Sequence, residues 1–161
     1  MGLLPELDLA VEAGAFIGYR FGGDRTGQGA LHTELTVVQD ISGVHDGLLA
    51  TASASYALLR QRDMFLSLET QATWANSDYT RAYFGVDDAS ALASGLDVYR
   101  PDSGVRDVGA GLTAGYWFSP SFGVIGRAGA AYLVGDPADS PITDEGSRWQ
   151  PFGGLALSYR Y

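Results

Sequence analysis

Residues 107–118 read DVGAGLTAGYWF, a stretch in which apolar side chains alternate with small or polar ones. An alternation with a period of two places every second side chain on the same face of a β-strand. The stretch therefore predicts a strand with one apolar and one polar face. The apolar positions are Val108, Ala110, Leu112, Ala114, Tyr116 and Phe118.

The same alternation recurs in six other segments, and all seven are long. Strands in soluble proteins usually have about five or six residues, whereas tilted strands that cross a bilayer need about 9 to 11. No apolar run reaches the roughly 18 residues of a transmembrane helix, so a membrane role would use strands. We predict an all-β fold, an antiparallel transmembrane β-barrel with seven strands, or eight if 81–86 or 96–100 adds one. The other six segments are residues 7–21, 31–41, 48–58, 64–74, 122–134 and 154–161.

Composition excludes several classes of function. The chain has 161 residues, which fit one domain over 1–161, and it carries a net charge of −9. Nucleic acid is excluded as a partner because phosphate binding needs clustered positive charge. The absence of cysteine excludes disulfides, thiolate metal sites and a cysteine nucleophile. Most of the 22 glycines fall in turns or on the polar face, where they leave room for larger side chains.

Loop lengths and aromatic residues indicate which face meets lipid. The connections at 60–63 and 119–121 are short and those at 77–104 and 136–148 are long, as in outer-membrane barrels with periplasmic turns and extracellular loops. Aromatic residues of the apolar face gather at the strand ends, where rings settle at headgroup depth. We expect this membrane girdle to contact outer-membrane lipid. It comprises Tyr19, Phe21, Tyr56, Tyr116, Phe118, Phe122, Tyr159 and Tyr161 at the short-turn end, and Trp74 and Tyr132 at the other.

The polar face would line the lumen of such a barrel. Opposite charges there can pair and avoid the cost of lipid exposure. They could form a selectivity lining or a plug, and we favour the plug because an interior about eight strands wide is filled by side chains. The six lumen charges are Glu12, Arg20, Glu34, Glu69, Arg127 and Arg160.

Nothing in the sequence points to catalysis, a metal or a cofactor. His32 is expected on the lumen face and His45 in a loop, and no serine elbow or paired-acid motif marks the catalytic set of a hydrolase. The aspartates of the two long connections match no calcium-loop spacing, so we expect them to be solvated. We therefore predict no catalytic residue, no metal ligand and no enzymatic activity. These aspartates are Asp87, Asp88, Asp97, Asp102, Asp136, Asp139 and Asp144.

Several segments resemble, in order, the MipA/OmpV family of outer-membrane proteins. They are VEAGAF at 11–16, DISGVHDG at 40–47, YFGV at 83–86, ASGL at 93–96, GVRDVG at 104–109, LVGDPADSPI at 133–142 and GLALSYRY at 154–161. The match corresponds to the last two-thirds of a typical member. The resemblance therefore implies the C-terminal part of a twelve-stranded barrel, without its signal peptide and first strands. The chain departs from the family in closing on Tyr161, where phenylalanine is more usual.

The resemblance implies a scaffold in the Gram-negative outer membrane that joins a lytic murein transglycosylase to a murein synthase. No residue can be carried over as a contact site. Two other functions stay open at this point: a narrow pore for small solutes, and a soluble barrel that binds an apolar ligand.

Overall fold

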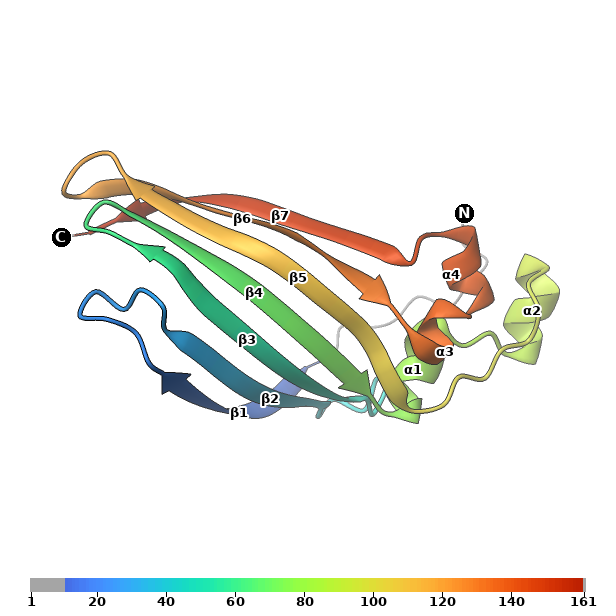
Figure 1. Cartoon of the computed structure of the whole chain (residues 1–161). Coiled ribbons are helices and arrows are strands. Elements are labelled where there is room, and N and C mark those ends of the chain that lie inside the picture. The colour runs from blue at the N-terminus through green and yellow to red at the C-terminus, as the bar shows by residue number, and fades with distance from the viewer. Residues whose placement is uncertain (1–10, 161) are drawn as a thin grey trace.

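Seven long strands form a single antiparallel sheet in chain order (Figure 1). The computed structural model describes residues 11–160. The predicted all-β antiparallel fold is confirmed. The strands are β1 (Glu12–Phe21), β2 (Leu31–Asp40), β3 (Leu48–Arg60), β4 (Met64–Ala75), β5 (Gly104–Trp117), β6 (Phe122–Leu133) and β7 (Trp149–Tyr159).

The sheet curves like part of a barrel wall, but it is not closed (Figure 1). Each inner strand pairs along most of its length with both neighbours. Within residues 11–160, β1 pairs only with β2 and β7 pairs only with β6. The described residues therefore form a barrel-like sheet with two free edges.

The two ends of the sheet differ (Figure 1). The connections β1–β2, β3–β4 and β5–β6 lie at one end, called here the short-turn end. The other, the loop end, carries the long connections and their helices. These are α1 (Ser77–Phe84) and α2 (Asp88–Ser94) between β4 and β5, and α3 (Gly135–Ala138) and α4 (Pro141–Glu145) between β6 and β7.

The suggestion of an eighth strand is wrong for the described residues. Residues 81–84 belong to α1, and Val86 and Tyr99 form only an isolated bridge with each other. The reason is local, because the Asn76 side chain accepts a hydrogen bond from the Tyr79 N–H and so caps a helix directly after β4. The start of β7 also differs, since Trp149 opens it five residues before the predicted segment.

No helix within residues 11–160 combines the length and the apolar character needed to span a membrane.

The register gives the sheet two chemically distinct faces. We call inner the face that carries Glu69 and Arg127, and outer the face that carries Leu68 and Leu112. Glu69 pairs with Gly111 of β5, and Leu68 pairs with Leu112. Because side chains alternate along each strand, this register assigns the residues of the sheet to one face or the other, except at the irregularities beside Leu58 and Arg106.

Large aromatic rings cover glycines on the inner face. The Phe65 ring lies where a side chain on Gly115 would point, and the Trp117 ring lies over Gly123 in the same way. Phe152 of β7 reaches across the glycine of β6 at position 129 toward Gly111 of β5. The expectation that small residues leave room for large inner side chains is confirmed at these positions.

We predict that Gly129→Ala destabilises the sheet by about 1–3 kcal/mol, the usual cost of overpacking. A Cβ at this position would collide with the backbone oxygen of Ala110 and lie 2.5 Å from Phe152 Cζ. The measurement is the free energy of unfolding by denaturant in micelles. Gly154→Ala is the matched control, because the same face has open space there. Equal stability of the two variants would contradict this account of the packing.

Candidate functional site

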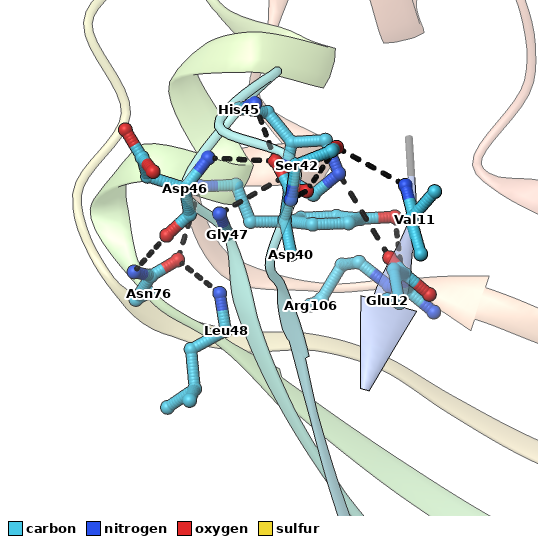
Figure 2. Close-up of polar contacts among 11 residues, drawn as sticks. Val11, Glu12, Asp40, Ser42, His45, Asp46, Gly47, Leu48, Asn76 and Arg106 are labelled. Atoms are coloured by element: carbon cyan, nitrogen blue, oxygen red, sulfur yellow. Dashed lines mark hydrogen bonds and ion pairs between the residues drawn. The ribbon is translucent and has the colours of Figure 1, made fainter. Parts of the chain in front are cut away.

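A polar cluster around Asp40 organises the loop end (Figure 2). The buried Asp40 carboxylate accepts hydrogen bonds from the backbone N–H groups of Ser42 (2.8 Å), His45 (2.8 Å) and Asp46 (3.1 Å), and from the Ser42 hydroxyl (2.5 Å). These donors, the His45 N–H first among them, hold the pKa of the Asp40 carboxyl well below its usual range. The carboxylate therefore fixes the 41–47 turn.

Asp40 lies beyond the level of the outer aromatic residues. Val37 pairs with Ala50, and Ala50 pairs with Trp74, so these three residues mark one level across the sheet. Asp40 is three residues further toward the helices, where it pairs with Glu12. The cluster thus belongs to the connections and not to the outer apolar band.

His45 lies in the loop between β2 and β3, as predicted, and is buried beneath α1. Its Nδ1 accepts a hydrogen bond from the Gly47 N–H (2.9 Å), and its ring packs edge-on against Tyr79 and Tyr83 at centroid distances of 5.8 and 5.4 Å. Its Nε2 is buried without a hydrogen-bond partner in the described part of the chain, 3.8 Å from Glu12 Oε1. The imidazole therefore joins the turn to the first helix.

Asn76 and Arg106 connect the cluster to the neighbouring strands. Asn76 Oδ1 accepts from the Leu48 N–H (2.9 Å) and the Tyr79 N–H (3.0 Å), which ties the start of β3 to α1. The Arg106 guanidinium donates to the Tyr79 hydroxyl (2.8 Å) and pairs with Asp107. Burial raises the pKa of the Tyr79 hydroxyl, partly opposed by the positive charge of Arg106.

Hydrogen bonds join the two long connections, β4–β5 and β6–β7, to each other. The Tyr99 hydroxyl donates to the Asp136 carbonyl (2.9 Å), and the Asp136 carboxylate accepts from the Asp102 N–H (2.7 Å). The Ser140 hydroxyl donates to the Phe84 carbonyl (2.6 Å). Three of the loop-end helices, α1, α3 and α4, therefore pack against one another.

Several of the acidic residues in these connections have structural partners. Asp87 caps α2 by accepting from the Ser90 N–H (2.7 Å), which lowers the pKa of its carboxyl. Across residues 11–160, no three carboxylate or imidazole groups come together in a metal-binding arrangement. Ion pairs join Arg81 to Asp102 (3.2 Å), Arg100 to Asp88 (3.5 Å) and Arg148 to Asp139 (3.4 Å).

The Asp40 cluster contains a serine, a histidine and an aspartate, but not in a nucleophilic order. A serine nucleophile must donate to its base, and the base must be oriented by the acid. Here the Ser42 hydroxyl donates to Asp40, while His45 Nδ1 accepts from the backbone of Gly47. The geometry therefore orders the turn and leaves no activated hydroxyl.

The inner face brings two of the six predicted charges into a direct ion pair. Arg127 Nε lies 2.9 Å from Glu69 Oε2, and Glu69 also accepts from the Thr113 hydroxyl (2.7 Å). The Arg127 guanidinium lies over the Phe152 ring at 4.8 Å. Charge, hydroxyl and ring together form a connected layer over β4–β7.

The other four predicted charges find different surroundings. Glu34 lies 3.8 Å from His32 Nε2 and accepts from a threonine hydroxyl of its own strand. Glu12 lies near His45, as described above. Arg160 stacks on the Trp117 ring at 3.6 Å. Neither Arg160 nor Arg20 has a carboxylate partner within the described residues.

Eight of the ten predicted girdle residues are exposed on or beside the outer face, and Tyr132 is half-buried. Tyr161 lies outside the described residues. At the loop end, Tyr132 packs against Trp149 at 5.1 Å, a neighbour that the predicted start of the seventh strand missed. The exposed eight are Tyr19, Phe21, Tyr56, Trp74, Tyr116, Phe118, Phe122 and Tyr159.

The comparison with protein families agrees with this geometry. A family model described as MltA-interacting protein MipA matches residues 2–161. The chain belongs to the MipA family. The resemblance found in the sequence is thereby confirmed. No curated protein and no solved structure matches the chain.

In this MipA-family chain, sequence reasoning missed the residues that hold the loop end together. Asp40 precedes Ser42 by two residues, a spacing typical of a side chain that accepts from the backbone of a turn. Asn76 precedes the helical segment as an N-cap does. Both signals are present in the sequence. The long-range contacts of His45 and Tyr79, in contrast, have no signal in the sequence.

We predict that Asp40→Asn lowers stability most at neutral pH. Because the folded-state pKa of Asp40 is depressed, its stabilising contribution is complete above the unfolded pKa of about 4. That contribution is lost as the pH falls toward the folded-state pKa. The gap in unfolding free energy between the unmodified chain and the variant should therefore narrow below about pH 4.

Unfolding by denaturant at pH 7 and pH 3 measures this gap. Asp46→Asn is the matched control, because the Asp46 side chain accepts no hydrogen bond from the turn and asparagine tolerates its positive φ of 50°. A gap that stays constant between the two pH values would show that the ionised carboxylate does not hold the turn.

Proposed function

We propose that this chain forms part of a Gram-negative outer-membrane β-barrel that acts as a scaffold for murein-cleaving and murein-synthesising enzymes. The observation that carries the proposal is membership of a family described by its interaction with MltA. The long strands and the apolar outer face support the membrane part of the proposal. The absence of an activated nucleophile in the Asp40 cluster agrees with a role in binding.

The outer face supports a lipid partner. Its exposed apolar side chains run the length of the strands and are flanked by aromatic residues at both ends. A continuous apolar surface of this kind is unusual on a soluble monomer and is typical of a contact surface. Leu35, Val37, Leu58, Leu68, Val108, Leu112, Leu155 and Leu157 belong to this surface.

The free edges of β1 and β7 favour closure by further strands. An unpaired backbone N–H or C=O in lipid costs several kcal/mol. We infer that the membrane-embedded barrel has additional strands between β1 and β7, in agreement with the twelve-stranded barrel of the family resemblance.

The inner face favours a scaffold over a pore. The rings of Phe65, Trp117 and Phe152 cover glycines of the wall, and the Glu69–Arg127 ion pair links β4 to β6. Interlocked side chains of this kind stiffen a barrel and narrow its interior. A rigid wall would present its turns to partners in fixed positions.

We predict that Leu112→Arg destabilises the protein in bilayers by about 2–4 kcal/mol, the cost of a cationic side chain at the middle of a lipid-facing strand. Gln71→Arg is the matched control, because Gln71 lies on the inner face opposite Gly109. The measurement is the free energy of unfolding from lipid vesicles. Equal losses for the two variants would contradict the assignment of the outer face to lipid.

We predict that the tagged full-length protein, expressed in a Gram-negative host, co-purifies a lytic murein transglycosylase and a murein synthase. The paired variants Arg25→Glu and Arg100→Glu change the charge equally at opposite ends of the sheet. If the short-turn end faces the periplasm, Arg25→Glu lowers capture about fivefold or more, as charge reversal at a docking surface does. Arg100→Glu should leave capture unchanged.

Two outcomes would contradict the scaffold. One is the absence of both enzymes from the purified protein at native expression levels. The other is a steady single-channel current through the full-length protein in planar bilayers, which would instead support a narrow pore for small solutes.

A further inference from the structure

The ten arginines of the chain divide into two groups by position. The five at the loop end and the middle of the sheet each pair with a carboxylate; they are Arg81, Arg100, Arg106, Arg127 and Arg148. The five at the short-turn end have no ion pair with any residue in 11–160. They are Arg20, Arg25, Arg60, Arg62 and Arg160.

The short-turn end also has few carboxylates to neutralise these arginines. Asp24 and Asp63 are the two that its described turns carry. Asp24 accepts from the Thr26 hydroxyl (2.6 Å), the Thr26 N–H (2.8 Å) and the Gln28 N–H (3.0 Å), which lowers the pKa of its carboxyl. The Asp24 carboxylate is therefore occupied by hydrogen bonds within the β1–β2 turn.

Two of the unpaired arginines share a hollow on the inner face. The hollow has a volume of about 380 Å³ and lies between the β1–β2 turn and the adjoining ends of β3 and β4. Hydroxyl and imidazole groups complete its polar lining. Its polar residues are Arg20, Thr26, His32, Ser55, Arg60 and Ser67.

The structure holds both guanidinium groups in place without a counter-ion. The β1–β2 turn closes onto Arg20 at Gly27, where φ is +85° and a Cβ would collide with Arg20 Nη2. Arg60 lies over the Phe65 ring at 4.9 Å, and its backbone N–H donates to Gln28 Oε1 (3.3 Å). The turn thus contacts the Arg20 guanidinium and the Arg60 backbone, while the Phe65 ring holds the Arg60 guanidinium.

We propose that this hollow, between Arg20 and Arg60, is a binding site for an oxyanion, a phosphate or carboxylate group. Two cations that face one cavity repel each other, and the planar guanidinium fork matches the geometry of both kinds of oxyanion. The hydroxyls of Ser55 and Ser67 supply further donors. The site goes beyond the scaffold function, and only the choice of a murein peptide as one probe rests on that function.

The oxyanion has two possible sources, a free inorganic ion and the carboxylate of a murein peptide. The test uses the full chain folded in a zwitterionic detergent, titrated separately with inorganic phosphate and with muramyl dipeptide in a calorimeter. Binding of either probe supports the site and identifies the source. Because charge-assisted binding is screened by ions, affinity should fall as sodium chloride is raised.

The decisive variant is Arg20→Gln combined with Arg60→Gln, which should weaken binding about tenfold or more because both charge-assisted contacts are lost. Arg62→Gln is the matched control: it removes one charge from the same end outside the hollow, and affinity should stay within about twofold. If the double variant does not fold, as judged by far-UV circular dichroism, Arg60→Gln alone carries the comparison with Arg62→Gln.

The variant Arg20→Lys with Arg60→Lys separates a shaped site from diffuse attraction. This variant keeps both positive charges but loses the planar guanidinium groups. It should therefore bind the oxyanion probe less tightly than the unmodified chain does. The proposal is overturned if neither probe binds. It is also overturned if Arg62→Gln weakens binding as much as the substitutions in the hollow.

Discussion

The register of the antiparallel ladder is the constraint on which the rest of the structure depends. A slip of one residue would exchange the two faces of a strand and place Glu69 and Arg127 where Leu68 and Leu112 now lie. Such an exchange would put charges on the apolar face of every strand it reached. The backbone pairing and the separation of apolar from charged side chains therefore specify the same register. Agreement between local and global preferences favours a single fold.

The strands were predictable from sequence because their signal is local and repeated. The period of two needs only neighbouring residues, so all seven strands could be located before any contact was known. The helices of the loop end gave no comparable signal. They have four to eight residues, and helices this short are stabilised by caps and tertiary contacts and not by periodicity. Val86 and Tyr99, read as possible strand residues, pair only with each other.

The candidate site could be predicted in part, because alternation is again a local signal. Alternation placed the charged residues on one face, but the choice of partner depends on which residues the register sets side by side. Glu69 and Arg127 meet because both lie next to residues 111–113 of β5. Arg160 finds the Trp117 ring instead of a carboxylate. His45 is held by rings from α1, a segment some 35 residues away in sequence whose position no local pattern specifies.

The two ends of the sheet use charge in opposite ways. At the loop end, buried or paired carboxylates hold turns, caps and neighbouring connections together, so much of the acidic excess of the chain serves to build the structure. At the short-turn end, arginines are stacked on rings or confined by a turn but lack carboxylate partners among the described residues. A guanidinium that is held in place but not neutralised keeps its hydrogen-bonding capacity for another molecule. The short-turn end therefore supports recognition of an anionic group better than the loop end does. Most charged groups of the larger loops already have partners within the chain.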